Sequence, residues 1–173
     1  MRIIITICAI LTATLVADAE VMPLLRVETL SGDKLVVPAP TATAPSLFVI
    51  GFTKKSRAQT SQWTQRLERD DSNGEPPYQV AILDDVPRFF RGVVLHAIRS
   101  GVPERLRKRF LIVFDNAEVW KRLARFLSPD DAYVLVIGAG GKLVWRTEGR
   151  LTEEHFRALL QAVRTARLQP SLP

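Results

Sequence analysis

The chain has 173 residues, of which 47% are hydrophobic, so it is long enough to bury the core of one domain and is not intrinsically disordered. Its formal net charge of +6 suits an anionic membrane surface or an acidic protein partner, and it serves solubility equally well. No nucleic-acid-binding motif accompanies this charge, so we expect no nucleic-acid partner.

The first 19 residues have the pattern of a secretory signal peptide. Arg2 gives a positive start, residues 3–16 are apolar, and small residues precede Glu20. We therefore expect residues 1–19 to be removed on export and residues 20–173 to form a single periplasmic or extracellular domain. The alternative is an uncleaved anchor, although the apolar run is shorter than the roughly 20 residues that span a membrane.

The cysteine content limits the chemistry. The chain has one cysteine, Cys8, which lies inside the expected signal peptide. A lipid anchor on Cys8 is disfavoured because the apolar run continues beyond it. The exported chain would have no thiol, and thiol–disulfide exchange or peroxide reduction requires a thiolate that attacks. We therefore expect neither activity, and no cysteine metal site.

The first half of the exported chain predicts a hairpin, a strand, a helix and a second strand. Residues 27–37 are β-favouring on both sides of a turn. The apolar run 47–52 is typical of a central strand that is covered on both faces. A helix is expected from Ala58 to Asp70, and the next strand from Tyr78 to Leu83.

An amphipathic helix is expected over residues 88–100, and a short basic helical piece over residues 104–109. The expected apolar face of the longer helix consists of Phe90, Val94, Ala97 and Ile98.

A third apolar strand is expected over residues 110–114, followed by a helix that Asp115 or Asn116 caps. The apolar stripe of that helix has the spacing i, i+3, i+4, i+7 and consists of Trp120, Leu123, Ala124 and Leu127.

A closing hairpin is expected from two strands, residues 133–137 and 142–146, around the glycine-rich turn Gly138–Gly141. Thr152 then caps a final helix that extends to about Ala166. The glycines do not form a phosphate-binding loop, because a strand and not a helix follows them. The order of elements predicts an α/β domain, a mixed sheet with helices on both faces.

The closing segment, residues 133–154, resembles the end of thioredoxin-like thiol–disulfide proteins and peroxiredoxins. The resemblance implies a thioredoxin-like three-layer sandwich. Those families carry a reactive cysteine directly after the first central strand, where residues 53–60 here read Thr-Lys-Lys-Ser-Arg-Ala-Gln-Thr. They also carry a cis-proline near the position of Ala132, where this chain has no proline. Both parts of the redox site are missing.

A narrower set of residues is similar to the mitochondrial ATP-synthase assembly-factor family, which has a thioredoxin-like fold without the redox dithiol. The shared positions are Gly51-Phe52, Gln59, Trp63, Gly101–Glu104, Arg109–Leu111 and Tyr133. This resemblance implies a redox-inactive binding or assembly module that acts with a protein partner, such as a membrane complex. It implies no cofactor.

The candidate binding site is the polar, basic segment that replaces the redox motif. It consists of Thr53, Lys54, Lys55, Ser56 and Arg57. The N–H groups at a helix N-terminus bind anions, so a carboxylate or phosphate of a partner could dock there. The alternative is a solvated basic loop.

Two other arrangements stay open from the sequence. One is an enzyme that uses non-thiol groups in the same cleft, drawn from Ser56 or Ser61, Asp84, Asp85 and His96. The histidines His96 and His155 are too few and too far apart to predict a metal site.

The second open arrangement is another basic surface for anionic headgroups or an acidic protein. It consists of Arg105, Arg107, Lys108 and Arg109, with Lys121, Arg122 and Arg125 near them in sequence.

Overall fold

The computed structural model describes residues 20–41, 44–70 and 75–168. The expected signal peptide lies outside these residues. Seven strands form one sheet in the order β2-β1-β5-β4-β3-β6-β7. Their bounds are β1 Leu25–Thr29, β2 Lys34–Val37, β3 Ser46–Gly51, β4 Tyr78–Ile82, β5 Phe110–Val113, β6 Ala132–Ile137 and β7 Leu143–Glu148. The central strands β3, β4 and β5 are parallel and the outer pairs are antiparallel, so the expected mixed sheet is confirmed.

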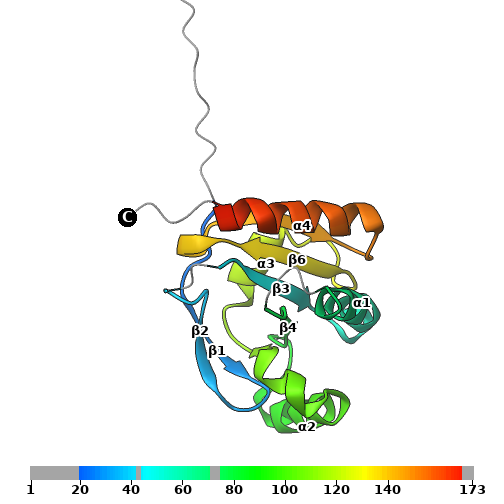
Figure 1. Ribbon diagram of the computed structural model, residues 1–173. Helices are drawn as coiled ribbons and strands as arrows, with labels where there is room; N and C mark the ends of the chain where they lie inside the picture. Colours follow the sequence, from blue (N-terminus) through cyan, green and yellow to red (C-terminus); the bar gives the residue numbers. More distant parts are fainter. Residues whose placement is uncertain (1–19, 42–43, 71–74, 169–173) are drawn as a thin grey trace, which may run out of the picture.

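Four α-helices cover the sheet (Figure 1). Their bounds are α1 Arg57–Glu68, α2 Arg91–Gly101, α3 Ala117–Ala124 and α4 Glu153–Leu168. The chain moves from β3 through β4 to β5 in one direction, and right-handed crossovers therefore place α1 and α2 on the same face. The core residues show that α4 shares this face and that α3 packs on the other. Helices on both faces were expected.

The hydrophobic core lies on both sides of β3 and β6. All six residues of β6 are buried, as are the four apolar residues Leu47 to Ile50 of β3. Side chains of a strand alternate between the two faces, so Phe48 and Ile50 pack toward α3, whereas Leu47 and Val49 pack toward α1 and α4. A continuous apolar run is the pattern that such a doubly covered strand requires.

Helix α1 is held firmly against the sheet. Trp63 has no exposed surface, and its indole N–H donates to the backbone carbonyl of Gly149 at 3.0 Å. One turn later, Leu67 is also buried. The guanidinium of Arg66 lies 4.0 Å from the ring centre of Phe156, which joins α1 to α4. These contacts hold α1 against the sheet, so its first residues stay close to the C-terminal end of β3.

The closing hairpin and the final helix form as expected. The backbone N–H of His155 donates to the hydroxyl of Thr152, which caps α4. Leu159 and Val163 are buried and Leu160 is half-buried. Phe156 is buried on the same face, although the sequence analysis did not name it.

The expected apolar stripe of α3 is wrong at its last position. Trp120, Leu123 and Ala124 are buried, but the helix ends at Ala124 and Leu127 is 76% exposed. Arg125 adopts a left-handed conformation with φ 50°, which stops the helix before it completes another turn.

The expected cap of α3 is also only partly correct. Asn116 occupies the N-cap position, but it has φ 65° and its side chain makes no capping hydrogen bond.

The expected apolar face of the helix over residues 88–100 is the largest error. No residue of α2 is buried, Phe90 is 52% exposed and precedes the helix, and Ala97 is exposed. Val94 and Ile98 are only half-buried. The segment before α2 is a short 3-10 helix, η3 Arg88–Phe90, so the phase of the apolar pattern changes where the two helices join.

Candidate functional site

The candidate site lies where β3 ends and α1 begins, which we call the corner (residues 53–57). The chain makes one 3-10 turn, η1 Lys54–Ser56, before α1 starts. Gly51 permits this turn, because a Cβ at Gly51 would lie 2.6 Å from the hydroxyl oxygen of Ser56. Ser56 is buried, and its hydroxyl donates to the carbonyl of Thr53 at 2.8 Å. Ser56 therefore supports the corner from inside and does not form its surface.

Asp130 joins the corner to the loop that precedes β6. Its carboxylate accepts a hydrogen bond from the hydroxyl of Thr53 at 2.9 Å. The ammonium of Lys55 lies 3.3 Å from the other carboxylate oxygen. Thr53 also accepts from the backbone N–H of Lys55 at 3.2 Å. The charge of Lys55 is thus compensated at the corner.

The side chain of Gln59 makes a second link between the same two segments. It donates to the carboxylate of Asp131 at 3.1 Å and accepts from the backbone N–H of Ala132 at 3.0 Å. We call the contacts of Asp130 and Gln59 the polar latch. The latch occupies the place where the resemblance puts two cysteines opposite a cis-proline.

Two cations of the corner have different surroundings. Lys54 is exposed and forms no ion pair with the described residues. The guanidinium of Arg57 points to the end of α2, where a Cβ added at Gly101 would lie 2.7 Å from it. A cation near a helix C-terminus is favoured by the helix dipole. The corner therefore presents Thr53, Lys54 and Lys55 together, with Arg57 turned to one side.

The side chains of the enzyme hypothesis have other partners. Ser56 bonds to Thr53, Asp84 forms an ion pair with Lys121 at 2.9 Å, and His96 is exposed on α2. No hydrogen bond joins Ser56, Asp84, Asp85 and His96 to one another in the part of the chain that the structure describes. In residues 20–41, 44–70 and 75–168 there is also no group of three or more acidic, histidine or cysteine side chains that could hold a metal.

The Lys121–Asp84 pair has a distinct electrostatic environment. The hydrogen bond to Asp84 raises the pKa of Lys121 above its ordinary value, and burial opposes this shift. Both side chains are between a quarter and a third exposed. The pair fixes α3 to the end of β4.

Arg109 and Lys121, which belong to two basic runs close in sequence, lie near opposite ends of strand β4. Lys121 pairs with Asp84, which follows the C-terminal end of β4. Arg109 pairs with Glu75, which precedes the N-terminal end of β4, at 2.9 Å. Lys121 therefore does not extend the surface of residues 105–109.

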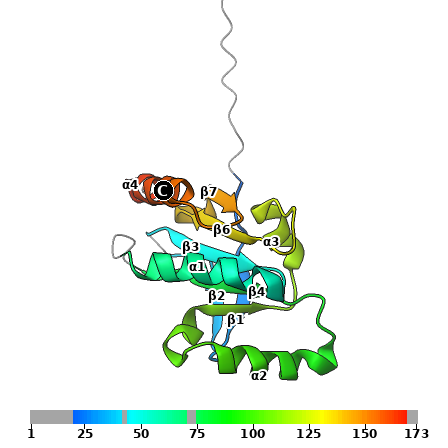
Figure 2. The same cartoon turned by 90° about the vertical axis from the view of Figure 1, so that its right-hand side faces the viewer.

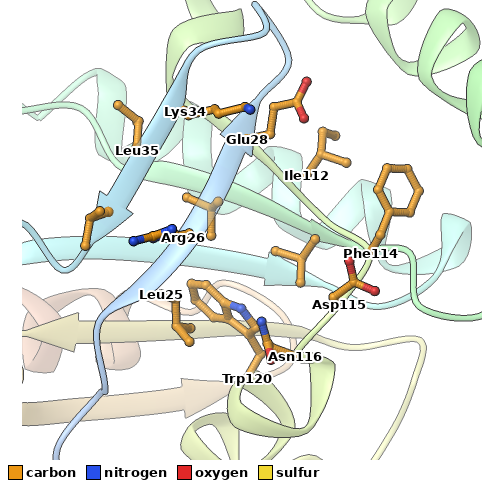
Figure 3. Close-up of a pocket in the computed structure, with 13 residues that line it drawn as sticks. Leu25, Arg26, Glu28, Lys34, Leu35, Ile112, Phe114, Asp115, Asn116 and Trp120 are labelled. Atoms are coloured by element: carbon orange, nitrogen blue, oxygen red, sulfur yellow. The ribbon is translucent and has the colours of Figure 1, made fainter.

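A groove of about 580 Å³ lies where β1 separates from β5 (Figure 3). The two strands pair only at Glu28↔Ile112 and Thr29↔Leu111. Trp120 lines the groove, and its buried indole N–H finds no hydrogen-bond partner among the described residues. Charges of both signs line it, from Arg26, Glu28, Lys34 and Asp115. No sequence pattern predicted this groove, because it depends on the divergence of two strands.

No protein-family model matches the sequence, and no curated protein matches it. Solved structures with a similar fold include the following three. A member of the Sco family of cytochrome c oxidase assembly proteins is 11% identical with a TM-score of 0.62, over 86% of this chain and 94% of that one. The exposed lipoprotein thioredoxin of Streptococcus pneumoniae is 11% identical with a TM-score of 0.59, over 80% and 98%. A thio-disulfide isomerase of Thermus thermophilus is 23% identical with a TM-score of 0.53, over 89% and 98%.

The structure and these comparisons establish the fold. The chain has a thioredoxin-like fold, with a seven-stranded mixed sheet between helices. The expected fold class is confirmed.

Proposed function

We propose that the chain is an exported, redox-inactive, non-enzymatic binding or assembly module with a protein partner. The observation that carries the proposal is the corner. Where a thioredoxin-like oxidoreductase needs a thiol, this chain has no cysteine, and the polar latch fixes Thr53 and Lys55 against Asp130. A fixed, exposed polar surface suits recognition by a partner, whereas an oxidoreductase needs an accessible thiolate.

The expected signal peptide supports the exported location. The carboxylate of Glu20 lies 2.7 Å from the guanidinium of Arg146. The carbonyl of Glu20 accepts from the backbone N–H of Leu143 at 2.8 Å. A chain that is cut before Glu20 keeps these contacts. Intact-mass measurement of the exported protein tests the cut, and a mass that retains Met1 would contradict it.

The nature of the partner is part of the same proposal. The similar Sco-family protein is described as a cytochrome c oxidase assembly protein, and the sequence resembles ATP-synthase assembly factors. Both support a role beside a membrane complex. None of the described helices is long and apolar enough to cross a membrane.

Charge reversal at the corner tests the proposal. We expect Lys54→Glu with Arg57→Glu to reduce capture of the partner from the exported fraction, because both side chains are exposed and neither takes part in the polar latch. Adding Lys55→Glu should reduce capture further. The matched control is Arg150→Glu with Arg157→Glu, two exposed arginines outside the corner.

Folding must be measured beside capture. Surface changes of this kind cost within about 0.5 kcal/mol each, so the double variant should lose no more than about 1 kcal/mol of its free energy of unfolding. Equal capture by a folded corner variant would reject the corner as the binding site. If the control variant also loses capture, the loss follows from the change in net charge and not from the corner.

A further inference from the structure

The net charge of the chain is concentrated in one part of the fold. Residues 88–109 contain seven arginines or lysines and one acid, Glu104, which gives a formal charge of +6. This equals the net charge of the whole chain, so the remaining residues are neutral in sum. The segment comprises η3, α2 and a further 3-10 helix, η4 Glu104–Arg109. We call it the basic layer.

Among the described residues, only Arg109 of the basic layer forms an ion pair with an acid. Arg99 donates to the carbonyl of Leu30, and Arg107 donates to the carbonyls of Val102 and Arg99. Such bonds hold the side chains in place and leave their charge uncompensated. Arg109, in contrast, pairs with Glu75. Arg88, Arg105 and Lys108 are exposed.

Large apolar side chains are exposed at one end of the same layer. Phe89 is 78% exposed, Phe90 is 52% exposed and Val93 is 67% exposed. The two phenyl rings lie 4.4 Å apart and form one aromatic patch. Exposed aromatic side chains that cluster on one surface mark an interaction site more often than scattered ones do.

The basic layer forms one end of the molecule. Figures 1 and 2 show α2 at the bottom, below α1, with α4 at the opposite end. No residue of η3, α2 or η4 is buried. Helix α2 rests on the sheet only through half-buried side chains such as Leu95 and Ile98. The outer surface of the layer is therefore available for contact along its whole length.

We infer that the basic layer docks on the surface of an anionic lipid membrane. Arginine and lysine attract anionic headgroups, and phenylalanine enters the boundary between headgroups and acyl chains. Residues 88–103 contain no acid at all. This segment therefore carries only positive formal charge, which is complementary to a negatively charged membrane surface. A lipid surface fits this layer better than an acidic protein does, because the exposed cations are spread over three helical segments while the aromatic side chains gather at one end.

This inference deepens the proposed role beside a membrane complex, but its test involves no partner. The exported protein is sedimented with vesicles of phosphatidylcholine that contain increasing fractions of phosphatidylglycerol. We expect binding that grows with phosphatidylglycerol content and weakens with salt. One charge near such a surface contributes roughly a fivefold change in binding. Arg105→Glu with Lys108→Glu should therefore weaken binding by at least about twentyfold.

The aromatic patch is tested separately. Phe89→Ala with Phe90→Ala should weaken vesicle binding by about tenfold or more, because the variant loses the inserted apolar surface. Two control variants carry substitutions outside the basic layer. Arg157→Glu with Arg164→Glu removes exposed charge from α4, and Leu127→Ala removes an exposed apolar side chain elsewhere. Neither control should change vesicle binding by more than about twofold.

Three results would overturn the inference. One is equal binding to vesicles with and without phosphatidylglycerol. Another is equal binding by the wild type and both variants of the basic layer, which would assign binding to another part of the chain. The third is an absence of vesicle binding, and if the Phe89 and Arg105 variants then lose the protein partner, the layer belongs to an acidic protein. Loss of partner capture in corner variants that still bind vesicles would separate this inference from the proposed function.

Discussion

The corner and the basic layer are both rich in lysine and arginine, but their surroundings differ. At the corner, Lys55 faces Asp130, and the helix that follows is anchored by the fully buried Trp63. In the basic layer, one acid accompanies seven cations and no residue of α2 is buried. A run of cations in a sequence therefore does not show whether nearby acids neutralise its charge in the folded protein. The acids that neutralise it come from distant segments, as Asp130 does for Lys55.

The largest expected effect concerns how firmly each region is anchored. Trp63→Ala should lower the free energy of unfolding by about 3–5 kcal/mol, because it removes a large buried side chain and leaves a cavity. Ile98→Ala on α2 should cost less than about 2 kcal/mol, because Ile98 is only half-buried. Denaturant unfolding measures both values. A cost for Ile98→Ala as large as that for Trp63→Ala would show that α2 is anchored like α1.

The next effect concerns the polar latch. Asp130→Ala removes the hydrogen bond from Thr53 and the ion pair with Lys55, and it should cost about 1 kcal/mol. Asp115→Ala is the matched control, because Asp115 is exposed in a loop after β5.

Hydrogen exchange at the corner sharpens this test. The backbone N–H of Lys55 donates to Thr53, so it should exchange faster in Asp130→Ala than in the wild type. Amides in α2 should be unaffected. If Lys55 exchanges at the same rate in both proteins, the contacts of Asp130 do not hold the corner.

The smallest expected effect is a loss of stability at alkaline pH, caused by deprotonation of Lys121. Its pKa in the folded protein is raised above the ordinary 10.5, chiefly by the hydrogen bond to Asp84. The stabilisation is therefore fully present below pH 10.5 and is lost as the pH rises through the pKa of the folded state. Asp84→Asn should cost up to about 1 kcal/mol at neutral pH. The difference from the wild type should shrink above about pH 10.5 and stay constant between pH 7 and 9. A difference that shrinks near pH 8 would assign the effect to another group.

The fold could be predicted from the sequence because its signals are local. The apolar runs around Phe48 and Leu111 predict doubly covered strands, and the hydroxyl of Thr152 caps α4 as expected. The glycines of residues 138–141 form the expected turn between β6 and β7. These patterns depend only on neighbours within a few residues.

The parts that could not be predicted depend on long-range contacts. Asp130 precedes β6, and only the antiparallel pairing of β6 with β3 brings it to Thr53. The available signal was that Asp130 lies two residues before β6 and close to Ala132, the position where the resemblance places a cis-proline. The stripe of α3 failed at Leu127 because the left-handed Arg125 ends the helix. The exposed Phe89 and Phe90 were not predicted, since helical periodicity cannot show that a helix lacks a deep contact with the sheet.

The proposed function requires that the exported chain carries out no redox chemistry. The most direct test is reduction of insulin disulfides by the exported protein, with a Cys8→Ser variant of the full chain beside it. Because the only cysteine lies within residues 1–19, we expect no turnover from the exported protein and none from the variant. Sustained disulfide reduction by the purified exported protein would contradict the account.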